Sequence, residues 1–260
     1  MNQANYRQIE RLLSGTDKDE LRQGLELIKK EIARVGSSEA RPLFEMLYAL
    51  LYIDPLEYPE LLDVLEEAIT LIVGFGSWVI PVLIDKLEAG DIKAQMAVAQ
   101  ALGRIGADAV EPLVNEYRIR EEAAKRIFIL YALGKIKSPK IVKAMDAAIE
   151  SCKAADMELR DTATRAVGKF IESIPPGAIP AELRNRIFKA LKANLACENP
   201  GVRSKAIRSL CKMGKFGHLN DDEKEKVKTI CHRLLGTDDQ FEWDRAFVVR
   251  REAQEGLKYL

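Results

Sequence analysis

The chain has 260 residues, of which 47% are hydrophobic, enough for a sizeable core and too many for a disordered chain. Its 40 basic and 40 acidic residues cancel, so no overall field draws the protein to nucleic acid or to an anionic membrane. The cysteines, Cys152, Cys197, Cys211 and Cys231, lack the short paired spacing of zinc sites and redox dithiols. We therefore expect buried free thiols and no metal site.

The charges are unevenly distributed along the chain. Residues 1–76 carry 8 basic and 14 acidic residues, whereas residues 77–260 carry 32 and 26. We expect the two ends to prefer different partners. The N-terminal residues lack the apolar run of a secretion signal, and no stretch approaches the ~18 apolar residues of a membrane span. The sequence therefore predicts a cytoplasmic protein that makes no membrane contact.

Seven segments align without gaps and predict the same amphipathic helix. In chain order they cover residues 26–36, 66–76, 96–106, 127–137, 161–171, 204–214 and 251–260. The third, seventh and tenth positions are apolar in every segment. This spacing places one hydrophobic stripe on one face of each helix.

Shorter amphipathic helices are predicted between the aligned ones. They lie around residues 40–52, 78–87, 109–117, 141–152, 183–195 and 224–235. Prolines near the predicted starts suit these positions, because a missing N–H costs little in a first turn. They are Pro42, Pro81, Pro112 and Pro139. Asn220 and Asp221 precede the last of these helices and are predicted to cap it rather than to act as a catalytic pair.

Four stretches resemble the second helices of HEAT repeats, especially the short variety described from phycobilisome lyases. They are QMAVAQALGRIGADAVEPLV (95–114), LRDTATRAVGKF (159–170), VRSKAIRSLCKMG (202–214) and VRREAQEGLKYL (249–260). The resemblance extends over nearly the whole chain. It implies an all-α fold, an α-solenoid (superhelix) of about seven HEAT-like helical hairpins, in a single domain over residues 1–260. Residues 1–76 would form acidic, more divergent repeats, and residues 77–260 regular, net basic ones.

The residues that could carry chemistry have simpler structural interpretations. Cys231 and His232 are adjacent, and neighbouring side chains on a helix point about 100° apart. This geometry favours a core cysteine and a surface histidine over a catalytic pair. Trp78 and Trp243 are interpreted as packing residues rather than as platforms for base stacking. Arginines directly before four aligned segments predict a ladder of ion pairs between repeats, with a binding role as the alternative. They are Arg126, Arg160, Arg203 and Arg250. No cofactor is expected.

The candidate binding site follows from the helix geometry. If positions three, seven and ten face the partner helix, then positions one, five and nine point away, toward the concave surface of a HEAT-like stack. Three apolar side chains, Met96, Ile127 and Tyr131, predict a patch there, beside a basic strip. The full candidate set is Met96, Gln100, Arg104, Ile127, Tyr131, Lys135, Arg165, Lys169, Arg208 and Lys212.

The function predicted from these features is a non-catalytic protein-binding scaffold or adaptor. Its concave groove would hold an acidic and apolar segment of another protein. Two alternatives stay open. The family resemblance also permits a subunit of a bilin lyase-like complex, or a nucleic-acid-binding protein like the HEAT-like DNA glycosylases, although the balanced charge argues against nucleic acid.

Overall fold

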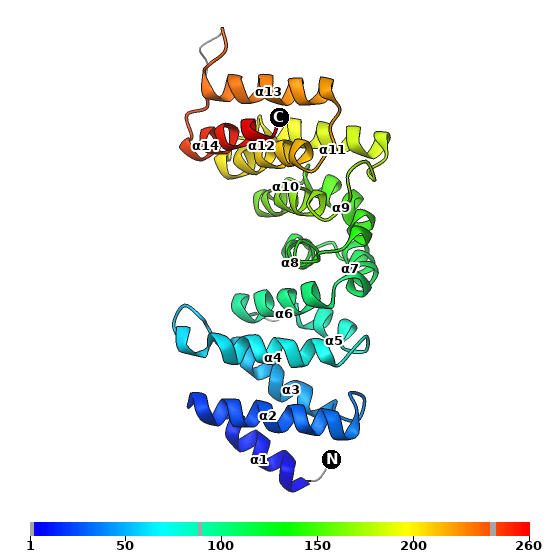
Figure 1. Cartoon of the computed structure of the whole chain (residues 1–260), viewed down its shortest axis with the longest axis vertical. Coiled ribbons are helices and arrows are strands. Elements are labelled where there is room, and N and C mark those ends of the chain that lie inside the picture. Colours follow the sequence, from blue (N-terminus) through cyan, green and yellow to red (C-terminus); the bar gives the residue numbers. More distant parts are fainter. Residues whose placement is uncertain (1–2, 88–89, 240–242) are drawn as a thin grey trace. The chain divides into compact units, whose positions relative to one another are not determined.

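The computed structural model describes residues 3–87, 90–239 and 243–260, and every regular element among them is helical. The fold is an all-α α-solenoid of HEAT-like helical hairpins (Figure 1). Contacts between residues divide the chain into two compact units, residues 1–112 and residues 113–260. The expectation of a single domain stays a prediction.

Unit 1 consists of three helix pairs in which α2, α4 and α6 contact one another in succession (Figure 1). Its elements are α1 (Gln3–Leu13), α2 (Lys18–Val35), α3 (Pro42–Ala49), η1 (Leu50–Tyr52), η2 (Pro59–Leu61), α4 (Leu62–Gly74), α5 (Val79–Lys86) and α6 (Ile92–Ile105). Helices α1, α3 and α5 each pack on the helix that follows.

Unit 2 repeats this plan. Its elements are α8 (Ala123–Leu133), η3 (Pro139–Ala144), α9 (Met145–Ser151), α10 (Met157–Ile171), α11 (Ala181–Asn194), α12 (Pro200–Lys215), α13 (Asp221–Leu235), α14 (Phe247–Gly256) and η4 (Leu257–Tyr259). Helices α8, α10, α12 and α14 contact one another in succession, and α9, α11 and α13 each pack on the next helix (Figure 1). The unit boundary falls within α7 (Ala107–Ile119), at Pro112.

All seven aligned segments are helical, in α2, α4, α6, α8, α10, α12 and α14, as the apolar period predicts. The intervening helices are confirmed too, although η3 and α9 together occupy the one expected around residues 141–152. Helix α1 was not among the predicted elements. Pro112 lies inside α7 rather than near its start, because the helix begins at Ala107, directly after the positive-φ Gly106 that ends α6.

The cap residues explain where several helices begin. Side-chain oxygens of Asp17, Asp91 and Asp156 accept backbone N–H groups in the first turns of α2, α6 and α10. At α13, Asn220 accepts the N–H of Glu223 at 2.8 Å, and the Glu223 carboxylate accepts the N–H of Asn220 at 2.9 Å. This reciprocal capping box confirms the predicted structural role of the polar residues before α13.

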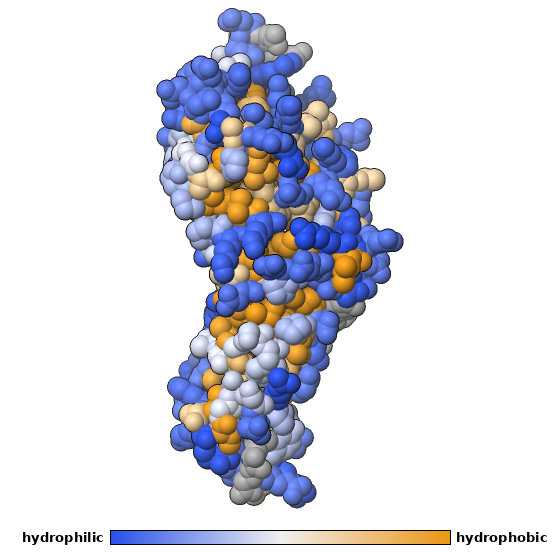
Figure 2. Space-filling model, turned by 90° about the vertical axis from the view of Figure 1, so that its right-hand side faces the viewer, coloured by the Kyte–Doolittle hydropathy of each residue, from blue (hydrophilic) through white to orange (hydrophobic). Residues whose placement is uncertain are grey.

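The core consists of the predicted apolar stripe. All seven residues at position three are buried: Ile28, Ala68, Val98, Ile129, Ala163, Ala206 and Ala253. At position seven, Leu102 and Leu133 are completely buried. Figure 2 shows hydrophobic side chains on one face as separate areas among hydrophilic ones. Burial of such a stripe in every hairpin supplies the main stabilising free energy of the fold.

Small residues allow neighbouring helices of unit 2 to approach closely. A Cβ atom added at Gly168 of α10 would overlap Ser209 Oγ of α12, and one added at Gly256 of α14 would overlap Cys211 Sγ of α12. The glycines therefore set the spacing of the stacked helices, because the facing side chains occupy the volume that a larger residue would need.

All four cysteines are buried free thiols, as expected. His218 is buried as well. It lies between α12 and α13, where its Nε2 is 3.3 Å from the Ile171 carbonyl oxygen. Periodicity could not predict this, because the residue follows the end of α12.

Candidate functional site

The ten predicted site residues are divided between the two units. Met96, Gln100 and Arg104 lie on α6 in unit 1, and the other seven lie in unit 2, on α8, α10 and α12 or directly after α8. None of the ten is buried. All ten side chains are therefore at least partly exposed, and their role as one binding surface stays a prediction. The joint patch of Met96 with Ile127 and Tyr131 stays a prediction.

In unit 1 the predicted polar residues are engaged with the preceding repeat. Gln100 Nε2 donates to Glu66 Oε1 at 2.9 Å, and Arg104 forms an ion pair with the same carboxylate. Burial would raise the pKa of Glu66, but the hydrogen bonds from Arg104 and Gln100 outweigh it, so the pKa is lowered. These side chains tie α6 to α4. Met96 stays exposed beside them.

In unit 2 a cavity of about 290 Å³ lies against α8 and α10. Leu130, Ala166 and the Tyr131 ring give it an apolar part. Its remaining lining residues are Gly134, Lys135, Lys137, Thr162, Arg165 and Lys169. The volume is at the small end of the range for ligand pockets, and suits a single large side chain of a partner.

A second cavity of about 130 Å³ adjoins the first, since both are lined by Arg165 and Lys169. We call the two cavities together the basic groove. Its cations come from three successive repeats: Lys135, Lys137, Arg165, Lys169, Lys205, Arg208 and Lys212. Sequence reasoning missed Lys137 and Lys205, which are at positions eleven and two of their segments and so lie outside the predicted positions one, five and nine.

Carboxylates within unit 2 engage most of these cations. Glu172 pairs with Lys169 at 3.2 Å, with Lys137 at 3.4 Å, and with Lys212. Burial opposes ionisation of Glu172, yet the neighbouring lysines lower its pKa. The other two pairs join neighbouring helices, Lys205 with Asp161 and Arg208 with Glu252. The pKa of Glu252 is lowered mainly by its hydrogen bond from Arg208.

Arg165 is the exception in the groove. It is exposed, it lines both cavities, and within the described part of the chain it makes no hydrogen bond or ion pair. Its neighbour Lys135 lies 4.8 Å from the centre of the Tyr131 ring. Ile127 is only half-buried, on the same helix as Tyr131. The groove thus combines an aromatic wall with a guanidinium whose five donors are available for an anion.

The four arginines before the aligned segments have a shared structural role. Each donates to the backbone carbonyl six residues upstream, at 2.6 to 2.9 Å. The acceptors are Arg120, Ala154, Cys197 and Asp244. These bonds fix the loop before each helix. The predicted ladder is present where Arg203 binds the Asp244 carboxylate through two hydrogen bonds, at 2.7 and 2.9 Å.

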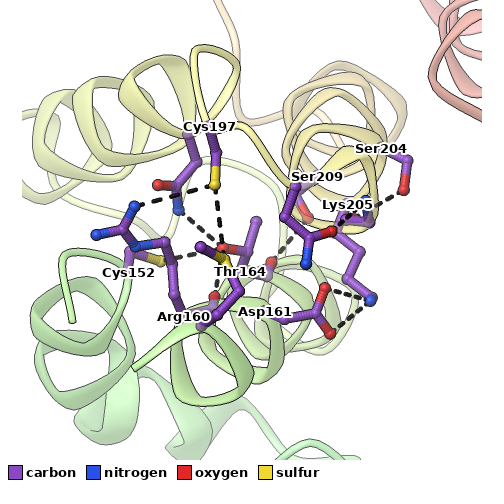
Figure 3. A network of polar contacts seen from close by, with 12 residues as sticks. Cys152, Arg160, Asp161, Thr164, Cys197, Ser204, Lys205 and Ser209 are labelled. Carbon is purple, nitrogen blue, oxygen red and sulfur yellow. Dashed lines mark hydrogen bonds and ion pairs between the residues drawn. The ribbon is translucent and has the colours of Figure 1, made fainter. Parts of the chain in front are cut away.

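A buried polar network connects α9, α10, α11 and α12 (Figure 3). Thr164 Oγ1 accepts from Asn194 Nδ2 at 2.8 Å and donates to the Arg160 carbonyl at 2.7 Å, while Ser209 Oγ donates to the Thr164 carbonyl at 3.1 Å. Cys152 Sγ lies 3.8 Å from Thr164 Oγ1. Burial raises the pKa of Cys152 to about 11, so the thiol is protonated at neutral pH and is a poor nucleophile. The network is structural.

Within the described residues, no group of three or more histidine, cysteine or acidic side chains could hold a metal ion. Nor does any helix there have the length and apolar character needed to span a membrane. His232, next to buried Cys231, is exposed and its Nδ1 lies 2.8 Å from Thr237 Oγ1. It therefore has a partner other than the thiol.

Comparison with protein families identifies one of the repeats. Residues 94–116 match the PBS lyase HEAT-like repeat, and this range nearly coincides with residues 95–114, on which the resemblance was based. The segment is similar to a HEAT-like repeat. It comprises α6 and most of α7. A search of curated proteins gives no match.

Solved structures agree with the fold. Two crystal structures of engineered proteins superpose with TM-scores of 0.55 and 0.53, at 20% and 18% identity. Both alignments cover 100% of this chain, and 96% and 98% of the engineered chains. An archaeal HEAT-like repeats protein from Thermococcus onnurineus NA1 is similar at 16% identity, with a TM-score of 0.47 over 94% of this chain and 97% of its own. For the two engineered proteins, at 20% and 18% identity, the likeness extends to the fold alone.

Proposed function

We propose that the chain is a non-catalytic protein-binding scaffold of the cytoplasm, and that its basic groove binds a segment of another protein that carries acidic and apolar residues. The observation that carries the proposal is Arg165, an exposed arginine without a partner in the described part of the chain, at the shared wall of two cavities. An unpaired guanidinium in such a position favours a carboxylate, which it can bind through two parallel hydrogen bonds.

The apolar part of the first cavity supports a partner with mixed chemistry. Leu130, Ala166 and the Tyr131 ring would receive an apolar side chain of the partner, and Arg165 a neighbouring carboxylate. Tyrosine and arginine are also the residue types that most often dominate binding energy at interfaces. The lysines around them are already engaged with internal acids, so they would mainly steer association at long range.

Pairing with internal acids also supports protein over nucleic acid. Nucleic-acid binding requires several cations that contact successive phosphates. In the groove, Glu172, Asp161 and Glu252 compete for the cations that such a backbone would need. A single unpaired arginine suits a local carboxylate better than a repeating polyanion.

The test compares three labelled probes by fluorescence anisotropy: a peptide of alternating leucine and glutamate, the same peptide with lysine for glutamate, and single-stranded DNA. We expect the chain to bind the acidic peptide with the highest affinity. Arg165→Glu should weaken this binding, whereas Arg118→Glu, an exposed arginine of α7 outside the groove, should not. Tighter binding of DNA, with a steep dependence on salt, would overturn the proposal, as would equal affinities of both variants.

The natural partner can be sought with the same matched pair. Wild-type, Arg165→Glu and Arg118→Glu chains serve as baits in extracts of the native cell, followed by mass spectrometry. Proteins retained by the wild type and by Arg118→Glu, but lost with Arg165→Glu, are partners of the groove.

A further inference from the structure

A loop of unit 1 presents unusually exposed apolar side chains. It covers residues 53–60, from the end of η1 into the first residues of η2, and we call it the Leu56 loop. Leu56 is 89% exposed and Tyr58 is 50% exposed. A leucine with almost all of its surface in water contributes nothing to the core, and a cluster of such residues marks an interaction surface.

The Leu56 loop is held in one conformation by Asp54, which is buried. One Asp54 carboxylate oxygen accepts the N–H of Leu56 at 3.0 Å, and its carbonyl accepts the N–H groups of Glu57 and Tyr58 at 3.1 and 2.8 Å. Lys93 of α6 forms an ion pair with the same carboxylate. The exposure of Leu56 is thus built into a fixed turn, and docking it would cost little conformational entropy.

The chemistry of this loop matches what the basic groove would take. Leu56 and Tyr58 alternate with two exposed acids, Glu57 and Glu60. Within the described residues, the side-chain carboxylates of these two acids make no hydrogen bond or ion pair. The groove offers an apolar cavity with Arg165 at its wall. Opposite charge also distinguishes the ends of the chain, since residues 1–76 have an acidic excess and residues 77–260 a basic one.

We infer that a second copy of this chain is an occupant of the basic groove. The Leu56 loop of one copy docks into the groove of the next, with Leu56 in the apolar cavity and Glu57 against Arg165. This inference rests on the proposed function of the groove. The loop and the groove are different surfaces, so the contact is head-to-tail and leaves one loop and one groove free. Assemblies therefore grow with concentration rather than stop at a dimer.

Sedimentation velocity of the full chain tests the inference. We expect the weight-average sedimentation coefficient to rise between about 1 μM and about 1 mM, the range for a small single-loop interface. The rise should shrink as salt increases from ~50 to ~500 mM, because charge complementarity contributes to it. Leu56→Glu and Arg165→Glu should each weaken association about tenfold or more. Ile119→Glu, which replaces a 71% exposed isoleucine of α7, should leave it unchanged.

A mixture of the two defective variants gives the decisive measurement. The Leu56→Glu chain keeps an intact groove and the Arg165→Glu chain keeps an intact loop, so together they should form one-to-one complexes and nothing larger. Both variants must retain the helical circular dichroism of the wild type. Association that persists in both variants, or a mixture without complexes, would overturn the inference. A wild-type chain that stays monomeric but binds the leucine and glutamate peptide would overturn it too, and would leave the proposed function intact.

Discussion

Position five of the repeat is used differently in α6 of unit 1 and in α10 of unit 2. In unit 1, positions five and nine of α6 are Gln100 and Arg104, and both bind Glu66, which is position one of the preceding aligned segment. In unit 2, position five of α10 is Arg165, and position one of the preceding segment is Ile127. Without a carboxylate there, Arg165 has no partner within the described residues. At position five, Gln100 is thus engaged by an acid of the previous segment, whereas Arg165 follows a segment without that acid and is left available for a partner protein.

The largest expected effects test the cores of the two units separately. Leu102 in unit 1 and Leu133 in unit 2 are completely buried at the same repeat position. Replacing either by alanine should lower the free energy of unfolding by about 2 to 5 kcal/mol, through lost burial and a residual cavity. Urea unfolding followed by circular dichroism measures this. If each change shifts a different transition, the two units unfold separately. Unchanged unfolding in both variants would contradict the register of the repeat.

The next effect concerns the groove alone. Tyr131→Ala removes the aromatic wall of the first cavity, and should weaken binding of the acidic peptide by more than ~2 kcal/mol, mainly through faster dissociation. Folding should survive, because the side chain is not buried. Tyr259→Ala is a matched control, since that tyrosine also packs against a lysine, Lys215, at 4.2 Å from the ring centre, but lines neither cavity. Stopped-flow kinetics measure dissociation of the acidic peptide from both variants. Equal dissociation rates of the two variants would show that the groove is not the binding site.

The regular parts of the fold could be predicted from sequence, and the partners of the site residues could not. An apolar residue every third or fourth position determines which helix face is buried, so position three is buried in all seven segments. Ion pairs depend on contacts between residues of different repeats, such as Arg104 and Glu66, 38 residues apart, or Arg208 and Glu252, 44 residues apart. The alignment contained one usable signal, because position one is Glu66 in one segment and Ile127 in another. This change predicts an unpaired arginine only if position one of a helix is known to contact position five of the next aligned helix.

Irregular segments gave the least sequence signal. The Leu56 loop departs most from the repeat pattern, and its exposure depends on the turn that Asp54 holds. His218 follows α12, where no periodicity applies, and only the packing of the chain buries it.

A pH effect of intermediate size distinguishes unit 2. Burial disfavours the charged imidazole and lowers the pKa of His218 from 6.5. The unfolded chain therefore binds this proton more readily, so the stabilising contribution is complete above pH 6.5 and is lost as pH falls toward the folded-state pKa. We expect the unfolding free energy of the wild type to fall between pH 7 and pH 5, above the range in which the carboxylates titrate. His218→Gln should flatten this slope. An identical slope in both chains would assign the effect to other groups.

The smallest expected effect is the coupling energy between side chains of neighbouring repeats. Double-mutant cycles on the free energy of unfolding measure it. Removal of Glu66 and Arg104, singly and together, should give a coupling energy of about 0.2 to 1 kcal/mol, the usual range for a partly exposed ion pair. In unit 2, a cycle with Ile127→Ala at position one and Arg165→Ala at position five should give no such coupling, because Arg165 makes no ion pair within the described residues. Ile127→Glu then supplies the missing acid. A cycle with Arg165→Ala in the Ile127→Glu background should show a coupling like that of unit 1, and the acidic peptide should bind this chain more weakly, because the guanidinium is now occupied from within. Loss of the apolar contacts of Ile127 lowers stability equally with and without Arg165. The cycle therefore cancels this loss and leaves the coupling energy of the new ion pair. Coupling without weaker peptide binding would show that Arg165 is free but is not the group that the partner recognises.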